Sequence, residues 1–110
     1  MEIERWDNGE VIFSGESIQE GIAKGIVFYH ADLRSADLSG ADLSGADLDM
    51  AGIPLSCGGL RWKIDRRIFV QFVYHLCSHQ IENDDCKAVQ KSLIKLANEM
   101  HRTDVPRLEE

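Results

Sequence analysis

The chain has no long hydrophobic run. None of its 110 residues falls in a stretch that approaches the roughly 18 apolar residues of a membrane-spanning helix. The N-terminus, MEIERWDNGE, lacks the basic and then apolar pattern of a secretion signal. Cysteine is scarce too: three residues at irregular spacing argue against a disulfide framework and are typical of a reducing compartment. We therefore expect a cytoplasmic protein.

The sequence also lacks the motifs of common catalytic sites. It contains no Gly-rich phosphate loop, no nucleophile elbow and no Ser/His/Asp order. His75, Cys77 and His79 lie in YHLCSHQ, Cys57 and Cys86 are the other cysteines, and two histidines four residues apart on a helix can share a metal ion. The alternative is that Cys77 belongs to a buried stripe, because free cysteine behaves as a small hydrophobic residue. We favour this alternative and expect no enzyme activity, cofactor or metal.

Negative charge is concentrated in the first part of the chain. Residues 1–60 hold eleven Asp and Glu against three Arg and Lys, a net charge of −8, whereas residues 61–110 hold eight against nine, a net charge of +1. A field of one sign on half of a small protein repels nucleic acid and favours basic partners.

Residues 1–25 are predicted to form a hairpin and a short helix. Two alternating apolar runs in IERWDNGEVIF are joined by residues 7–9, whose Asn-Gly pair is typical of a tight hairpin turn. In SIQEGIAKG, Ser17 and Glu20 fit a capping box, and Gly25 suits the position after a helix end.

Residues 31–50, ADLRSADLSGADLSGADLDM, repeat Ala-Asp-Leu four times at intervals of five. Neither the 3.6-residue period of a helix nor the two-residue period of a strand gives this spacing. A chain that turns a corner every five residues would point each leucine inward, with the preceding alanine beside it and an aspartate outside on each of four sides. Extending this phase back to residues 13–23 would bury Glu16 without a partner, so we prefer a helix there.

These units resemble the pentapeptide-repeat family, whose pattern is A-(D/N)-L-x-x. The resemblance rests on the units that begin at Ala31, Ala36, Ala41 and Ala46, with looser units on either side. It implies a β-solenoid, a short right-handed quadrilateral β-helix with one pentapeptide per side, which we expect over residues 26–58. Stacked coils leave an open strand edge at each end unless something covers it.

Two amphipathic helices are predicted to form a helical cap over residues 59–102. The first runs from Trp62 to Leu76 and the second from about Asp84 to Met100, with polar residues from Asn83 at its start. Their apolar residues are Ile64, Ile68, Phe69, Phe72, Val73 and Leu76, then Cys86, Val89, Leu93, Leu96, Ala97 and Met100. We expect a helical hairpin packed on the last coil, within one domain of residues 1–110, and a frayed tail over residues 103–110.

The resemblance also implies a function. Several pentapeptide-repeat proteins present regularly spaced acidic groups and mimic DNA, and the long dimeric ones protect DNA gyrase. One to two coils are only about 10 Å tall by the strand spacing, too short to copy a rod of duplex. The short repeat with a helical cap also resembles phage anti-CRISPR proteins of pentapeptide-repeat type that act on type I Cascade. The expected function is a DNA-mimic inhibitor that occupies the basic surface recognising the PAM duplex, in the cytoplasm of a bacterial host if the protein is phage-encoded.

The partner of such a protein is a basic DNA-binding surface, and no direct contact with nucleic acid or membrane is expected. The acidic residues expected to bind it are Asp32, Asp37, Asp42, Asp47, Asp49, Glu10, Glu16 and Glu20. The competing interpretation of the repeat aspartates is that they form turns, since Asp readily bonds neighbouring backbone groups. Two other functions stay open: a modulator of DNA gyrase or topoisomerase, and a scaffold that binds proteins through Ile68, Phe69 and Phe72.

Overall fold

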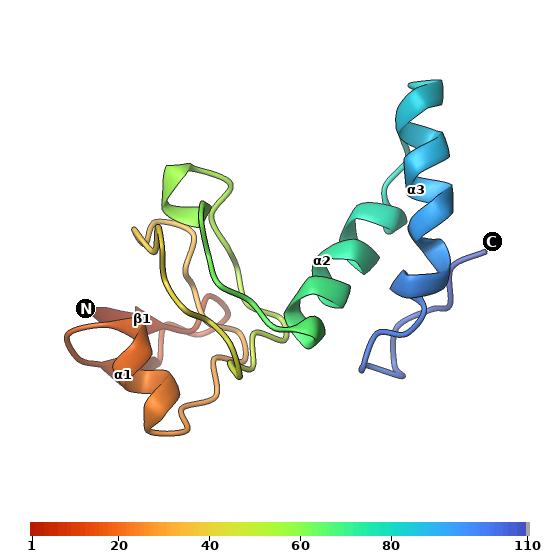
Figure 1. Ribbon diagram of the computed structural model, residues 1–110. Coiled ribbons are helices and arrows are strands. Elements are labelled where there is room, and N and C mark those ends of the chain that lie inside the picture. Colours follow the sequence, from red (N-terminus) through yellow and green to blue (C-terminus); the bar gives the residue numbers. More distant parts are fainter. Residues whose placement is uncertain (110) are drawn as a thin grey trace. The chain divides into compact units, whose positions relative to one another are not determined.

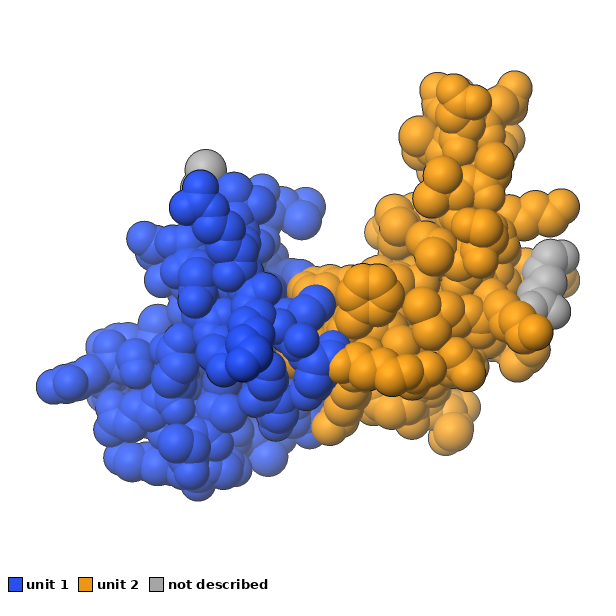
Figure 2. All heavy atoms as spheres, in the orientation of Figure 1, with its two compact units in different colours: residues 1–65 blue, residues 66–110 orange. Residues whose placement is uncertain are grey.

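The computed structural model describes residues 1–109, apart from the side chain of Cys57. Its elements, in order, are β1 (Glu2–Glu4), β2 (Val11–Ser14), α1 (Ile18–Ala23), the 3-10 helix η1 (Cys57–Gly59), α2 (Arg66–Ser78) and α3 (Asp84–Ala97) (Figure 1). The chain divides into two compact units, residues 1–65 and residues 66–110, which Figure 2 colours separately. We name them the repeat unit and the helical unit.

The predicted hairpin is confirmed. β1 and β2 pair antiparallel, with Ile3 opposite Phe13, and both of these side chains are buried. Gly9 in the turn has a φ of 73°, which glycine adopts without strain. Beyond β1 the chain continues alongside the repeat, where Arg5 forms an isolated antiparallel β-bridge with Ala31. The hairpin therefore lies against the first unit of the repeat.

The short helix α1 is also confirmed, which decides against extending the five-residue phase through it. The Ser17 side chain caps the helix by accepting the Glu20 backbone N–H at 3.3 Å. The Glu20 carboxylate accepts the N–H of Glu16 at 2.9 Å rather than that of Ser17, so the capping box is displaced by one residue. Gly21, a weak helix former, is where α1 packs closely, because a Cβ there would lie 3.0 Å from the Phe28 ring.

A backbone turn explains the period of five. The N–H of each repeat alanine donates to the carbonyl of the apolar residue three positions earlier, as in Ala41 to Leu38 at 2.9 Å and Ala46 to Leu43 at 3.0 Å. The residue before the alanine has a positive φ at four of these corners, which is the geometry of a type II turn. These corner residues are His30, Gly40, Gly45 and Met50. Four residues make the turn and the aspartate is the fifth.

The side chains of the repeat point as the spacing predicts. Leu33, Leu38, Leu43 and Leu48 are all buried. The alanines beside them are also buried, except for the half-buried Ala36, which lines a surface hollow. Alternating large and small inward positions fill a narrow interior with aliphatic groups.

In the repeat unit, backbone segments 19 or 20 residues apart in sequence lie side by side and form hydrogen bonds. The N–H groups of Phe28 and Leu33 donate to the carbonyls of Asp47 and Gly52, and that of Leu43 donates to Lys63 at 2.8 Å. These contacts form isolated parallel bridges, Asp32 to Gly52 and Asp42 to Lys63, and the described residues outside β1 and β2 form no regular strand. The turns leave too few residues on each side for a longer ladder.

The boundary between repeat and helices lies later than predicted. Lys63 bonds the backbone of residues 41 and 43, so residues 59–65 belong to the repeat unit rather than to a cap. α2 consequently begins at Arg66 and not at Trp62. The apolar Ile64, which suggested a helix, lies in this last part of the repeat unit.

In the helical unit, α2 and α3 pack against each other as the predicted helical hairpin. The buried residues of their core are Val73, Tyr74, Cys77 and Ala97. The predicted faces are partly wrong. Phe69 and Leu76 of α2 are 49% and 52% exposed, and on α3 Val89 is 59% exposed and Cys86 is also exposed. The core uses Val73, Tyr74 and Cys77 of α2 and the C-terminal half of α3.

The tail after α3, which was expected to be frayed, contacts the helices in the structure. The Tyr74 hydroxyl donates to the Pro106 carbonyl at 2.5 Å. The amide of Asn98 bonds both backbone groups of Leu108, donating at 2.9 Å and accepting at 2.8 Å. Val105 and Leu108 also pack against the core of the helical unit. The tail is therefore held by the helices up to Leu108, and Glu110 lies outside the described residues.

Candidate functional site

The repeat aspartates form turns with their own backbone. In each unit the Oδ1 atom accepts the N–H of the residue two positions later, at 3.0 to 3.3 Å. The pairs are Asp32 with Arg34, Asp37 with Ser39, Asp42 with Ser44 and Asp47 with Asp49. The competing interpretation of these residues thus has a structural basis, and each Asp helps to hold its unit in place.

Asp32 and Asp42 also lie next to a cation. Asp32 forms a bidentate pair with Arg34, with Nε to Oδ1 at 2.9 Å and Nη2 to Oδ2 at 3.0 Å. This pairing is the main reason that the pKa of Asp32 lies below its ordinary value. The pKa of Asp42 is lowered chiefly by the N–H of Ser44, and Lys63 lies 3.7 Å away. Both carboxylates stay ionised, but a neighbouring positive charge offsets their field.

The glutamates chosen from the sequence also differ in whether a cationic side chain lies next to the carboxylate. Glu20 pairs with Lys24 at 3.0 Å, and its pKa is lowered mainly by the N–H of Glu16. Glu10 and Glu16 are exposed, as is Asp37. Within the described part of the chain, these three carboxylates have no cationic side chain at ion-pair distance. They are better placed than Asp32, Asp42 or Glu20 to attract a basic partner.

Two neighbouring hollows gather part of the acidic set on one surface. The first, of about 360 Å³, is lined by Glu2, Glu4 and Asp32 among others. The second, of about 200 Å³, is lined by Glu16 and Asp37, and Met1 lines both. We call these five carboxylates the acidic face. The ammonium group of Met1 donates to the carbonyl of Gly15 at 2.6 Å.

The acidic face shares Asp32, Asp37 and Glu16 with the set chosen from the sequence. Asp42, Asp47, Asp49, Glu10 and Glu20 line neither hollow. Glu2 and Glu4 were missed, although their signal was present. In β1 they alternate with the buried Ile3, so both must lie on the outer side of the strand.

The net charge divides sharply between the two units. The repeat unit holds twelve Asp and Glu against five Arg and Lys, which gives −7, and the helical unit holds seven against seven. The net charge of the whole chain is therefore that of the repeat unit. A partner that responds to charge would be attracted to this unit.

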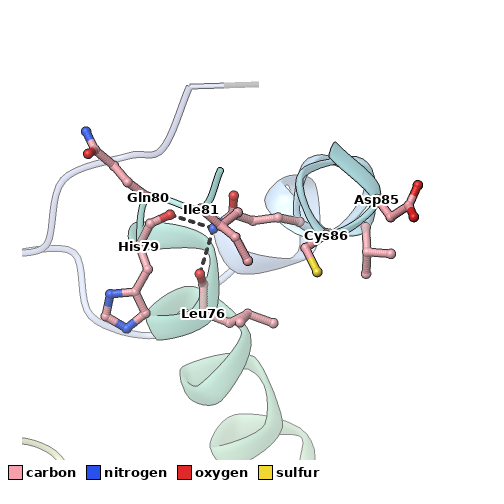
Figure 3. A pocket seen from close by; sticks show the side chains of 8 residues that line it. Leu76, His79, Gln80, Ile81, Asp85 and Cys86 are labelled. Carbon is pink, nitrogen blue, oxygen red and sulfur yellow. Dashed lines mark hydrogen bonds between the residues drawn. The ribbon is translucent and has the colours of Figure 1, made fainter. Parts of the chain in front are cut away.

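The helical unit has a different surface feature, an apolar groove of about 530 Å³. Leu76 of α2, Ile81 of the connecting loop and Cys86 and Val89 of α3 line it (Figure 3). The side-chain amide of Gln90 donates to the carbonyls of Leu76 and His79, at 2.8 and 2.7 Å, and ties the end of α2 to α3. The groove contains the apolar residues that the predicted helix faces would have buried.

The described residues do not support a metal site. No three His, Cys, Asp or Glu among them are arranged to hold a metal ion. Cys77 is buried, its thiol donates to the Gln90 carbonyl at 3.4 Å, and burial raises its pKa. His75 and His79 are exposed. The side chain of Cys57 lies outside the described part of the chain. Cys77 is thus a core residue, as the favoured alternative had it.

Residues 18–49 match the family of pentapeptide repeats, as eight copies. The match covers under a third of the chain and includes α1, which folds as a helix. The chain has no match among curated proteins or solved structures. Among the helices described, none is both long and apolar enough to cross a membrane. The chain therefore contains a segment of pentapeptide repeats, flanked by a hairpin, a short helix and a helical unit.

Proposed function

We propose that this protein is a non-enzymatic inhibitor that covers the basic DNA-binding surface of another protein with its acidic face. The observation that carries the proposal is the division of charge, −7 on the repeat unit and zero on the helical unit. Surfaces that bind DNA obtain much of their affinity from neutralised phosphates without regard to sequence. Carboxylates such as Glu4, Glu16 and Asp37 can supply the same field.

The proposed scaffold of this face is a short right-handed quadrilateral β-helix of about two coils. A turn at almost every fifth residue, inward leucines and hydrogen bonds between residues 19 or 20 apart support it. Two coils at the usual strand spacing are about 10 Å tall. Such a surface covers a patch of a DNA-binding protein rather than a length of duplex groove, which favours a local decoy over the extended mimicry of gyrase-protecting proteins.

The proposed target is a bacterial type I Cascade complex, and the proposed setting is phage counter-defence in the host cytoplasm. The lysines and arginines with which such a complex recognises the PAM duplex would face the acidic face. Electrostatic attraction would speed the encounter and exclude the duplex by occupying its phosphate sites. In this proposal the protein contacts neither nucleic acid nor membrane.

The test is a DNA-loading competition. Purified Cascade is incubated with increasing amounts of the protein, and loading of a labelled target duplex is measured. We expect loading to fall with protein concentration, and the inhibition to weaken as salt rises, because screening acts on exposed charges. Unchanged loading at every concentration would rule out Cascade as the target.

A protein-interaction scaffold is the second candidate, and the apolar groove favours it. Leu76 and Val89 are more than half exposed in this groove, which is where a partner helix would pack. Binding through such a groove depends little on ionic strength. A partner whose affinity survives high salt and is lost in Val89→Asp, while the Glu16→Gln variant binds normally, would identify this function instead.

A further inference from the structure

An exposed aromatic cluster lies where the hairpin turn meets the repeat. Trp6, Tyr29 and Met50 are 46%, 42% and 43% exposed, unusually high for such large side chains. The rings of Trp6 and Tyr29 contact the ring of His30, with centroid distances of 5.1 Å and 4.0 Å. We call Trp6, Tyr29, His30 and Met50 the aromatic patch. Tryptophan and tyrosine are the residues most enriched at the energetic centres of protein interfaces.

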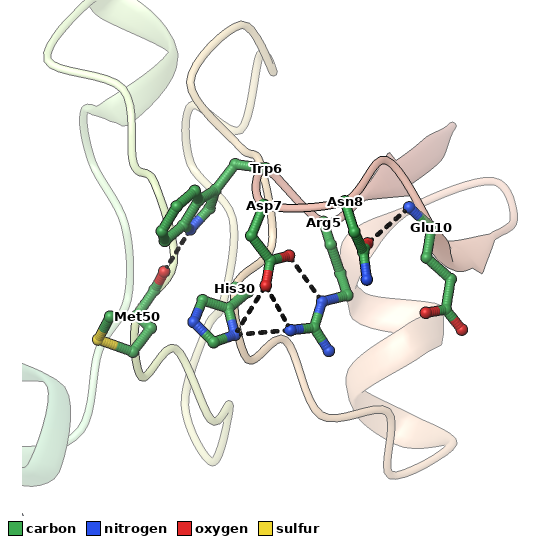
Figure 4. A network of polar contacts seen from close by, with 7 residues as sticks. All are labelled: Arg5, Trp6, Asp7, Asn8, Glu10, His30 and Met50. Carbon is green, nitrogen blue, oxygen red and sulfur yellow. Dashed lines mark hydrogen bonds and ion pairs between the residues drawn. The ribbon is translucent and has the colours of Figure 1, made fainter.

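Two hydrogen bonds hold Trp6 in place within the patch. The backbone N–H of Trp6 donates to the His30 carbonyl at 2.9 Å, and its indole Nε1 donates to the Met50 carbonyl at 2.6 Å (Figure 4). Trp6 thus joins two corners of the repeat that lie one coil apart. A large side chain fixed in this way loses little conformational entropy when a partner covers it.

Two residues of the patch occupy strained backbone positions. His30 and Met50 have φ values of 61° and 60° at corners where other units place Gly40 and Gly45. Glycine would adopt this conformation without strain, whereas a side chain with a Cβ makes it costly. Strain of this kind is often found at functional sites, where the side chain rather than the backbone is needed.

The net charge of the repeat unit that carries the patch is −7, which favours a cation over an anion as its ligand. The one arginine at the patch, Arg5, is already paired with Asp7 through Nε to Oδ1 at 2.8 Å and Nη2 to Oδ2 at 2.6 Å, and it also contacts His30 Nδ1 at 3.0 Å (Figure 4). The remainder of the repeat unit is strongly acidic. Cations bind well against the faces of indole and phenol rings, and more strongly in a negative field.

We propose that the aromatic patch binds an arginine or lysine side chain of the protein partner, anchoring the complex that the acidic face attracts. This inference rests on the proposed function for the identity of the partner, but not for the chemistry of the patch. The acidic face would supply long-range attraction, and the patch would supply a contact that persists when salt screens the charges.

Trp6 itself reports on the patch. In a Trp62→Phe background, tryptophan fluorescence comes from Trp6 alone, since the chain has two tryptophans. A hexa-arginine peptide is the probe, titrated at moderate salt. We expect the peptide to cause a saturable change in Trp6 emission. The Tyr29→Ala variant should bind the peptide about threefold to tenfold more weakly, because it loses one contact between a cation and an aromatic ring. Met50→Gly keeps the carbonyl that Trp6 needs and should also weaken binding. Thermal melting verifies that each variant folds.

The outcomes separate this inference from the proposed function. If the peptide leaves Trp6 emission unchanged, or if Tyr29→Ala and Met50→Gly bind it as tightly as the parent, the patch is not a cation site. The same two variants are then compared in the DNA-loading competition. Full inhibition by both would overturn the anchor role while leaving the acidic inhibitor intact. Failure of the unmodified protein to inhibit would overturn the proposed target, and the peptide titration would still decide the chemistry of the patch.

Discussion

At the scale of single residues, each repeat aspartate has two properties that can be separated by mutation. Its Oδ1 atom accepts a backbone N–H, and its carboxylate carries a charge. Asparagine keeps the acceptor and loses the charge, whereas alanine loses both. The aspartates therefore cannot be assigned to folding or to binding by their position alone.

Asp37 is the best place to test this separation, because its oxygen bonds both the N–H and the hydroxyl of Ser39. We expect Asp37→Asn to melt close to the wild type and Asp37→Ala to melt a few degrees lower, since one turn bond is lost. Differential scanning calorimetry provides the measurement. Equal melting temperatures for the two variants would mean that the turn bond contributes nothing.

Asp7 links stability to pH. Its hydrogen bonds to Arg5 lower its pKa from 3.8 to about 2. The unfolded chain therefore binds this proton more readily than the folded one, so the ion pair stabilises the fold above about pH 4 and stops doing so as pH falls through about 2. In Asp7→Asn this contribution is absent at every pH. The difference in melting temperature between wild type and variant should shrink between about pH 5 and pH 2, and a constant difference would contradict the assignment.

At the scale of elements, the corners of the repeat select residues by backbone conformation. Gly45 and Arg61 both have positive φ values, of 81° and 62°. We expect Gly45→Ala to destabilise the protein by about 1 kcal/mol, because the new Cβ is strained there. Arg61→Gly should leave the melting temperature unchanged or raise it, because it removes such a strain. Chemical denaturation of both variants decides the point, and a loss of stability in Arg61→Gly equal to that in Gly45→Ala would contradict it.

The inward and outward positions of one unit form a matched pair. Leu43 is fully buried, whereas its neighbour Ser44 is partly exposed. Leu43→Asn should cost about 3 kcal/mol or more, because it leaves a cavity and buries an amide. Ser44→Asn should cost under about 1 kcal/mol as a surface change. Similar denaturation midpoints for the two variants would show that the interior of the repeat is not packed as the structure has it.

Elements governed by neighbours in sequence could be predicted, and those governed by distant contacts could not. The Asn-Gly turn, the Ser17 cap and the period of five all act over a few residues, and each was found in its expected place. The buried face of α2 depends on how α2 packs against α3. The prediction from the apolar pattern alone was therefore wrong for Phe69 and Leu76, which are exposed. The position of the tail depends on Asn98, a polar residue whose bonds to Leu108 leave no periodic signal.

At the scale of the whole molecule, the acidic face is formed by residues far apart in sequence. Glu4 and Asp32 lie together because the chain after β1 runs beside the first unit of the repeat, with the N–H of Asp32 donating to the Glu4 carbonyl at 2.7 Å. The sequence showed that the first half of the chain is acidic, but not which carboxylates share a surface. An even ring of aspartates was expected, and two members of that ring, Asp32 and Asp37, line the hollows together with three glutamates.

We propose that inhibition depends on where the negative charge lies on this protein rather than on how much of it there is. Glu4→Gln, Glu16→Gln and Asp37→Asn together remove three charges from the acidic face. Glu82→Gln, Asp85→Asn and Glu109→Gln together remove three from the helical unit. Both triple variants have the same net charge, and all six residues are exposed in the structure.

The decisive measurement is the half-inhibitory concentration in the DNA-loading competition, for wild type and both triple variants at low and high salt. We expect the half-inhibitory concentration of the acidic-face variant to rise at least about tenfold at low salt, because each lost charge at a basic site removes roughly 1 kcal/mol or more of binding free energy. Its half-inhibitory concentration should also depend less on salt than that of the wild type. The helical-unit variant should inhibit within about twofold of wild type, as expected for charges away from the interface. Equal inhibition by the two triple variants would contradict the account.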